Sequence, residues 1–482
     1  MKRPLRVGLF GTGLDAYWPQ FKGLKPRLQD YVRVVQKKME RPRVEVVNRG
    51  LIDKPVKALA AGPKFRATSQ TRLTSSASCW AWKWRGYVES QVNIQPSTFN
   101  AEHRTYRLHR FIRRGALNVQ CSIFFCTFAW LATVAQAERA VIPAIPEGRR
   151  VDTNTLRQIY DGVKTPFKYG VVLKGADTNE FVDCPSIFRS GNHWFMMYVA
   201  ITNQVGYQTF LARSDDLLHW EKLGKILSFT QTNEWDVWQA DGGIALADYH
   251  WDGSHELEKF DGKFWLAYIG GAKQGYETDP LSIGIAWTKS PAKIKEWNRV
   301  PENPVLSPKQ TDVREFERKT LYKSQVIHDE AESLGFPFVM FYNGKYKNGF
   351  ERIGMAVSRD LVHWNRYGEN PVVANGEAKT NGMSGDPQIV KIGDVWTMFY
   401  FGAGWQPKAF DTFACSYDLV HWTKWNGANL IEPSEPFDKT YAHKPWVLKW
   451  HGVVYHFYCA VGSEGRVIAL ATSRDLKIKA GR

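Results

Sequence analysis

The 482-residue sequence predicts an all-β fold from about residue 150 to its end. Two observations lead to this prediction: an aromatic-rich, strand-like run occurs five times in this part, and a short tag ending in His-Trp follows several of the runs. A third observation limits its extent, because neither pattern occurs in the first 137 residues. Such repeats indicate a fold built from equivalent units that stack on one another.

The five runs share a tyrosine and have the length of one buried strand. They are "WFMMYVAI" (194–201), "FWLAYIGG" (264–271), "FVMFYNG" (338–344), "WTMFYFGAG" (396–404) and "VYHFYCAVG" (454–462). A shorter strand pattern and a glycine turn precede most of the runs, and a third strand pattern follows them. Each repeat is therefore expected to be a small antiparallel sheet.

The tag closes the third strand pattern of each repeat. Its copies are "SDDLLHW" (214–220), "SRDLVHW" (358–364), "SYDLVHW" (416–422), the truncated "SRDL" (473–476) and the degenerate "IKEW" (294–297). Successive tag tryptophans lie 77, 67 and 58 residues apart, which suits four-stranded blades. The sequence thus predicts a five-bladed β-propeller, in which the tag aspartate caps a turn and the tryptophan packs between blades.

Three different segments precede the propeller, which is expected over residues 138–482. In residues 1–62, "RVGLFGTGLDAYW" predicts a strand and a glycine turn, and "FKGLKPRLQDYVRVVQKKME" predicts a helix. This α/β-like fragment resembles the start of the L-fucose/L-arabinose isomerase-like family, but it is too short to imply isomerase activity. Residues 63–107 show no sustained period and form an unassigned linker.

Residues 108–137 resemble a secretory signal peptide inside the chain. Arg113 and Arg114 precede an apolar stretch from Ile123 to Val134, and Ala135-Gln136-Ala137 follows as a small-x-small cleavage pattern. The apolar stretch is too short to span a membrane, so no stable membrane insertion is expected. We expect that two reading frames have been joined and that a secreted or periplasmic protein matures near Glu138.

The positive charge of the chain lies in its front part. The whole chain holds 64 Lys+Arg and 48 Asp+Glu, and residues 1–137 hold 24 and 7 of these. The remaining 40 and 41 leave the propeller near neutrality, which argues against a nucleic-acid partner. Cys184, Cys415 and Cys459 form no metal-binding or disulfide pattern and are expected to pack in the core, and neither a metal nor a cofactor is expected.

Ionisable residues stand where the innermost strand of each blade is expected to begin. Aligned on the shared tyrosine, these segments are "VDCPSIF", "GSHELEKF", "LYKSQVI", "SGDPQIV" and "AHKPWVL". They carry Asp183, Glu256, Lys323, Asp386 and the pair His443-Lys444. Because clustered charges are unfavourable unless they are paired or used, we expect an active site at this end of the axis.

The repeats and the "DCPSI" opening resemble the five-bladed furanosidase-like superfamily of glycoside hydrolases over residues 160–476. Its arabinanase/xylosidase branch implies an acidic pair, whereas its neoagarobiose hydrolase branch implies Asp183 as base, Asp386 as modulator of a pKa and His443 as acid. A carboxylate near His443 would keep it protonated. Glu256 and Glu317 remain rival acids.

The expected function is inverting, exo-acting hydrolysis of an oligosaccharide or polysaccharide. The expected substrate-binding residues are Lys444, Lys323, Glu317, Trp238 and Trp405. Two alternatives stay open: a glycoside phosphorylase that uses phosphate in place of water, and a non-catalytic carbohydrate-binding propeller.

Overall fold

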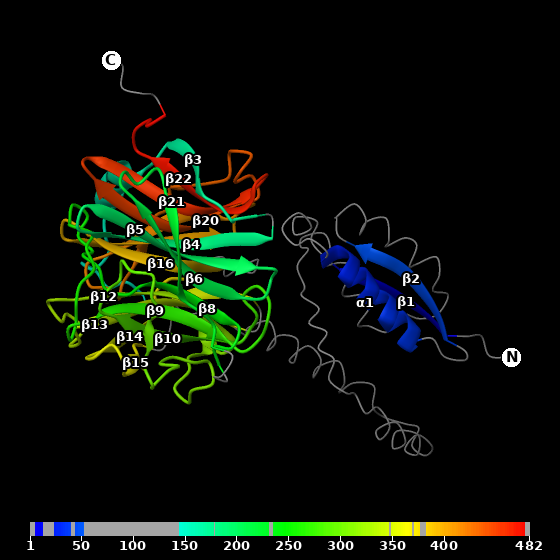
Figure 1. Ribbon diagram of the computed structural model, residues 1–482. Coiled ribbons are helices and arrows are strands. Elements are labelled where there is room, and N and C mark those ends of the chain that lie inside the picture. Colours follow the sequence, from blue (N-terminus) through cyan, green and yellow to red (C-terminus); the bar gives the residue numbers. More distant parts are fainter. Residues whose placement is uncertain are drawn as a thin grey trace, which may run out of the picture. The chain divides into compact units, whose positions relative to one another are not determined.

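The structure, a computed structural model, divides the chain into two compact units, Met1–Arg139 and Ala140–Arg482 (Figure 1). It describes residues 5–12, 24–39, 44–52 and 144–477, without residues 178, 231–234, 347–348, 369–370 and 376–381. The linker predicted over 63–107 and the signal-like segment over 108–137 lie outside the described residues. No helix in the described ranges is long and apolar enough to cross a membrane.

The first unit contains the predicted strand and helix. Strand β1 (Leu5–Thr12) pairs in parallel with β2 (Val44–Ile52), and helix α1 (Leu24–Met39) lies between them in the chain. A parallel pair requires such a crossover connection, so the fragment is one βαβ element.

The second unit opens with helix α5 (Thr153–Val163). Asp152 caps it, because its Oδ1 accepts hydrogen bonds from the backbone N–H groups of Asn154 and Thr155 at 2.9 and 3.0 Å. Leu156, Ile159 and Val163 follow at helical spacing and are buried. The chain then enters strand β3 (Phe167–Leu173).

The rest of the second unit is built from blades of four antiparallel strands, which we number 1 to 5; one parallel pair, Glu351 and Met383, joins blades 3 and 4 into a single sheet. Blade 1 contains β4 (Glu180–Ser190), β5 (His193–Thr202), β6 (Tyr207–Ser214) and β7 (Glu221–Leu227), and blade 2 contains β8 (Gln239–Ile244), β9 (Phe264–Gly271), β10 (Leu281–Thr288) and β11 (Asn298–Arg299). Blade 3 contains β12 (Thr320–His328), β13 (Phe338–Lys345), β14 (Glu351–Ser358) and β15 (Trp364–Arg366), and blade 4 contains β16 (Met383–Ile392), β17 (Val395–Ala403), β18 (Phe410–Ser416) and β19 (Thr423–Lys424). Blade 5 contains β20 (Tyr441–Trp450), β21 (Val453–Gly462), β22 (Gly465–Thr472) and β3.

The five blades form a closed ring, as the five repeats predict. Strand β3 pairs with β22, so the last blade combines strands from both ends of the unit. Each blade contacts the next, and blade 5 contacts blade 1 through β22 and β4. A small cavity on the axis is lined by residues of all five innermost strands, β4, β8, β12, β16 and β20. Because the ring is closed, every blade has a neighbouring blade on both sides.

The recurring aromatic residues pack the blades together. The shared tyrosine of the second strand is at most 2% exposed in every blade; these residues are Tyr198, Tyr268, Tyr342, Tyr400 and Tyr458. Trp220 of blade 1 contacts Phe457 of blade 5 edge-on, and Trp422 of blade 4 contacts Phe341 of blade 3 in the same way. Each tag tryptophan therefore fixes its blade against the preceding one.

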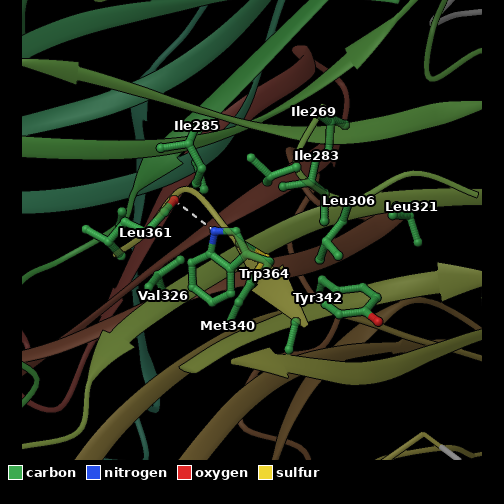
Figure 2. Packing of buried hydrophobic residues seen from close by; sticks show 14 of the residues in the cluster. Ile269, Ile283, Ile285, Leu306, Leu321, Val326, Met340, Tyr342, Leu361 and Trp364 are labelled. Carbon is green, nitrogen blue, oxygen red and sulfur yellow. Dashed lines mark hydrogen bonds between the residues drawn. The ribbon is translucent and has the colours of Figure 1, made fainter. Parts of the chain in front are cut away.

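The tag turn has the structure that its sequence predicts. Asp360 Oδ1 accepts hydrogen bonds from the N–H groups of Val362 and His363, and Leu361 adopts a positive φ of 67°. Figure 2 shows the indole N–H of Trp364 donating to the carbonyl of Leu361, beside Ile283 and Ile285 of blade 2. The repeated tag is thus a structural element.

One end of the axis is covered by the loop 245–263 between β8 and β9, which we call the plug loop. Its Trp251 N–H donates to the carbonyl of Lys391 at 3.0 Å, and its His255 carbonyl accepts from Arg189 N–H at 2.8 Å. Arg189 and Lys391 lie at the far ends of β4 and β16. We call this the closed end and the end where β4 and β16 begin the open end.

Strand β3 should be required for the propeller, whereas the first unit should not. A chain that begins at Ala140 keeps β3. We expect it to unfold cooperatively, with the same Tm as the second unit has in the full-length chain. A chain that begins at Asn179 loses β3 and its buried Leu173, exposing the edge of β22. We expect aggregation or loss of cooperative unfolding in calorimetry. Equal Tm values for both chains would contradict this role of β3.

Candidate active site

The innermost strands carry irregularities where they begin at the open end. Their pairing registers shift between Asp183 and Ser186, Leu321 and Ser324, Gly385 and Gln388, and His443 and Trp446. In three of these bulges a residue with positive φ precedes a proline: Cys184 (50°), Asp386 (51°) and Lys444 (64°). Bulges re-aim side chains, and strained backbone of this kind gathers at functional sites.

Asp183 lies at the centre of a buried ionic network. Its Oδ2 accepts hydrogen bonds from Lys444 Nζ at 3.0 Å, Arg466 Nη1 at 2.8 Å and Tyr207 Oη at 3.2 Å. Its side chain is completely buried. Burial alone would raise its pKa, but the ammonium of Lys444 and the guanidinium of Arg466 hold the pKa well below the usual range. Asp183 is therefore a permanent carboxylate with its oxygens already engaged.

Lys444 connects Asp183 to a carboxylate that sequence reasoning missed. Its Nζ also donates to Glu277 Oε1 at 3.0 Å. The Lys444 and Arg466 cations both lie over the ring of Tyr276, at 6.0 and 4.9 Å from its centroid. Although burial opposes it, the charge of Asp183 raises the pKa of Lys444 well above its usual value. Glu277 is thus held by a permanent cation.

A second buried pair joins blades 2 and 3. Lys323 Nζ lies 2.7 Å from Asp241 Oδ1 and also donates to the carbonyl of Gly242 at 3.1 Å. Burial raises the pKa of Asp241 despite the opposing effect of Lys323. Lys323 therefore lies at the open end, as predicted, and neutralises an aspartate on β8.

Burial raises the pKa values of two carboxyl groups that share a cavity with Glu277. Burial raises the pKa of Asp386 to about 7, and the charges of Lys444 and Lys323 only partly oppose this. Burial also raises the pKa of Glu351; Lys345, 3.4 Å away, opposes this shift, and Glu277 adds to it. Glu277, Glu351 and Asp386 line one cavity of about 20 Å³, which has room for a water molecule. The site thus places Glu277, which is paired with the Lys444 cation, beside two carboxyl groups whose pKa values are raised.

His443 does not have the charge state that the sequence analysis expected. Burial, together with the charges of Arg466 and Lys444, lowers its pKa to about 3 and outweighs Asp183. Its Nδ1 lies 3.3 Å from the carbonyl of Cys459. The prediction that a neighbouring carboxylate keeps His443 protonated is wrong, because burial and two cations outweigh that carboxylate. His443 is a neutral imidazole.

The expected position of Glu256 is also wrong. Glu256 belongs to the plug loop at the closed end, where it is half exposed and 3.8 Å from Arg189 Nη1. The alignment assumed a short turn before the run 264–271, but blade 2 has the plug loop there. The innermost strand lies before this loop, in "QADGGI", and its acidic residue is Asp241.

Glu317 is a structural residue rather than a ligand for sugar. It lies in a 3-10 helix (Glu315–Glu317), fully buried, where its Oε1 accepts from Arg366 Nε and from the backbone N–H of Arg314.

Trp238 and Trp405 follow the expectation only in part. Both flank strand ends at the open end, but their rings pack against Phe229 and Phe410, so they stack within the protein.

Glu277 and Glu351 escaped the sequence analysis because they do not belong to innermost strands. Glu351 begins β14, the third strand of its blade, and Tyr207 and Arg466 lie at the corresponding starts of β6 and β22. First and third strands run in the same direction, so their starts meet at the open end. A comparison of third-strand starts would have found Glu351. Glu277 lies in the loop between β9 and β10, outside the repeat.

Cys184, Cys415 and Cys459 are free and buried, as expected. Cys184, however, lines the site, with its Sγ 3.7 Å from Asp241 Oδ2 and 3.8 Å from Asp386 Oδ2. Among the described residues, no group of three or more His, Cys, Asp or Glu side chains is arranged to hold a metal ion.

Comparison with solved structures identifies the kind of protein. One similar solved structure is a complex of BT0996 with RGII, and another is described as a glycoside hydrolase. Each is 44% identical in sequence to this chain and has a TM-score of 0.65. Each match covers 69% of this chain and 98% of the other. This chain belongs to their family of glycoside hydrolases. Of the three functions predicted, the family thus supports the enzymatic cleavage of glycosidic bonds.

Curated relatives of this glycoside hydrolase match over shorter ranges. A 1,2-beta-oligomannan phosphorylase of Thermoanaerobacter sp. (strain X514) is 31% identical over 147 residues, 28% of this chain and 46% of the phosphorylase. The chain thus spans about half the length of that relative. The uncharacterized protein Rv1502 of Mycobacterium tuberculosis is 24% identical over 269 residues, 53% of this chain and 80% of Rv1502. No protein-family model matches, and the comparisons give the isomerase resemblance of residues 1–62 no support.

The raised pKa of Asp386 predicts a stability gain for Asp386→Asn at high pH. Because the folded pKa is about 7 against an ordinary 3.8, the folded glycoside hydrolase keeps a proton that the unfolded chain releases. Folded stability therefore falls as pH rises between these values, by up to ~4 kcal/mol. Asparagine cannot ionise, so denaturant unfolding should show a gain at about pH 8 and little change at about pH 4. A loss of stability at pH 8 would contradict the protonated state.

Proposed function

We propose that the enzyme hydrolyses glycosidic bonds with Glu277 as the base or nucleophile and Glu351 as the proton donor. One observation carries this proposal: the two carboxyl groups line the same cavity in contrasting surroundings, because Glu277 is paired with Lys444 whereas burial raises the pKa of Glu351. Cleavage of a glycosidic bond needs one group that activates water or attacks the sugar and one that protonates the leaving oxygen. Pairs of titratable groups in contrasting surroundings supply these roles.

Glu351 is better suited than Asp386 to donate a proton repeatedly. After donation the acid is an anion, and Glu351 then has Lys345 Nζ and Asn343 Nδ2 within 3.4 Å of its oxygens. Asp386 Oδ2 instead faces the thiol of Cys184 at 3.8 Å, which is a weak donor. Ionisation of Asp386 would add a charge close to Glu277, which fits its predicted role as a modulator of a neighbouring pKa.

Asp183 acts in this proposal as a positioning residue. It was predicted as the general base, but its side chain is completely buried and its oxygens accept several hydrogen bonds. It holds Lys444, and Lys444 holds Glu277. The sequence analysis expected the base on the first blade. In this proposal the base is Glu277, which is joined to Asp183 through Lys444.

The substrate that we propose is a polysaccharide similar to the RGII of the related complex. Exo action remains a prediction. Inversion remains a prediction, and proton NMR of the first product anomer tests it.

Export through the segment 113–137 is also proposed, and N-terminal sequencing of the secreted protein tests it.

Phosphorolysis is the second candidate, because a curated relative is a phosphorylase. A phosphate would need cations at the site that are not already neutralised. The two cations that line the cavity are paired: Lys323 with Asp241, and Lys444 with Asp183 and Glu277. Water is therefore the favoured acceptor, and sugar release that depends on phosphate would reverse this choice.

Leaving-group kinetics should separate the two roles. Glu351→Gln should lose about 10²- to 10⁴-fold in kcat/KM on a natural linkage but keep much of the activity on an activated aryl glycoside, which needs little protonation. Glu277→Gln should lose activity on both substrates. His443→Gln and Glu256→Gln serve as controls and should show no dependence on the leaving group. If Asp386→Asn shows the rescue and Glu351→Gln does not, the acid is Asp386.

The pH profile should respond to Lys345. The proposed acid works while protonated, so kcat/KM should fall as pH rises through the raised pKa of Glu351. Lys345 opposes that shift, so Lys345→Met should raise the pKa further and move the alkaline limb to higher pH. Lys319→Met, which removes the partner of Asp279 instead, is the matched control. An alkaline limb that stays in place or moves to lower pH would exclude Glu351 as acid.

A further inference from the structure

A groove of about 640 Å³ runs along the outer side of blades 4 and 5, away from the cavity described above. Its lining includes Phe167 and Lys168 of β3, Gln406 of the β17–β18 loop, and Asn429 and Glu432 before β20. This volume is within the range of ligand pockets, about 300–1,000 Å³, whereas the cavity beside Glu277 holds about 20 Å³. The groove can thus accept several sugar units.

An exposed aromatic ring marks one end of the groove. Phe167 begins β3, the outermost strand of blade 5, and is 43% exposed. Among the described residues, the large apolar side chains exposed to a similar degree are few: Val34, Ile294 and Tyr417 are the others. A flat apolar face beside polar groups suits the apolar face of a sugar ring.

Paired amides mark the other end. Asn429 Nδ2 donates to Gln406 Oε1 at 2.9 Å, and Gln406 Nε2 lies 3.3 Å from Asn429 Oδ1. Asn429 Nδ2 also donates to Glu432 Oε2 at 3.0 Å. These contacts orient the two amides at the surface, and amides both donate and accept, as sugar hydroxyl groups require.

The walls of the groove are fixed by the propeller. Leu430 N–H donates to the carbonyl of Asp411 on β18, and Asp411 N–H donates to the carbonyl of Ile431, both at 2.9 Å. Lys168 Nζ donates to Asp438 and to the carbonyl of Glu432, which ties β3 to the opposite wall. The groove is therefore formed before any ligand binds, so binding requires little ordering of the protein.

The groove leads away from the face that carries the active site. Strand β17 ends at Ala403, which pairs with Met383 at the start of β16, so Gln406 in the following loop lies at the open end. Phe167 pairs with Thr472, at the end of β22 remote from its start at the open end. The groove thus extends from the open end along the side of the blade.

We propose that this groove binds a neutral, extended segment of the polysaccharide whose end enters the active site. The inference rests on the proposed function for the identity of the ligand. Glu432, Glu435 and Asp475 line the groove against Lys477 and the already paired Lys168, which disfavours a polyanionic chain. The groove would hold a large substrate while its terminal sugar is cleaved.

Affinity electrophoresis of the full chain carrying Glu277→Gln tests binding without turnover. The gels contain soluble RGII, arabinan, xylan or, as the anionic control, polygalacturonate. We expect retention by at least one of the first three, weakened about three- to tenfold by Phe167→Ala and kept by Phe167→Tyr. Tyr417→Ala, similarly exposed but outside the groove, should change nothing. The proposal is overturned if none of the gels with RGII, arabinan or xylan retains the protein. It is also overturned if Phe167→Ala and Tyr417→Ala change the retention equally.

Kinetics of the otherwise unchanged enzyme separate this proposal from the catalytic one. Phe167→Ala should raise KM on the retained polysaccharide about three- to tenfold with kcat unchanged, and leave an aryl glycoside unaffected. If the enzyme hydrolyses both substrates but Phe167→Ala changes neither, the groove is wrong and the proposed function stands. If retention depends on Phe167 but no glycan is cleaved, the proposed function fails and the groove stands.

Discussion

The charge balance of a buried cluster at the open end constrains everything else about this protein. Five carboxyl groups and four cations lie there with little access to water, and an unpaired buried charge costs several kcal/mol. The pKa of Asp386 is accordingly raised to about 7, and that of Glu351 is also raised, and a glycosidase needs a carboxyl group of this kind. The cluster consists of Asp183, Asp241, Glu277, Glu351, Asp386, Lys323, Lys345, Lys444 and Arg466.

The propeller fold holds the side chains of this cluster in a fixed arrangement. Bulges before prolines turn Cys184, Asp386 and Lys444 toward the axis, while the plug loop covers the other end. The tag tryptophans and buried tyrosines lock neighbouring blades, and β3 closes the ring. Because each blade contributes between one and three members of the cluster, a loosened blade would leave an unpaired charge. Ring closure and charge pairing thus depend on each other.

Sequence reasoning predicted the repeat well and the site in part. The blades follow from periodic aromatic runs, because inter-blade packing demands the same residues at the same places. Lys323, Asp386 and Lys444 were also found, since they begin innermost strands. Glu277 could not be found in this way, because a loop outside the repeat places it there. The charge state of His443 depends on burial and on two cations, of which the alignment of innermost strand starts contains only Lys444, because Arg466 lies at the start of a third strand.

The raised pKa of Glu351 is the central claim, and infrared difference spectroscopy followed as pH rises measures it directly. The spectrum of the wild-type protein minus that of Glu351→Gln should contain the carbonyl band of a protonated carboxylic acid at low pH. That band should persist above the pH at which an ordinary glutamate ionises and disappear as pH rises through the raised pKa of Glu351. A band that is lost at or below the pH at which an ordinary glutamate ionises would show that the pKa of Glu351 is not raised, and the account of the acid would be wrong.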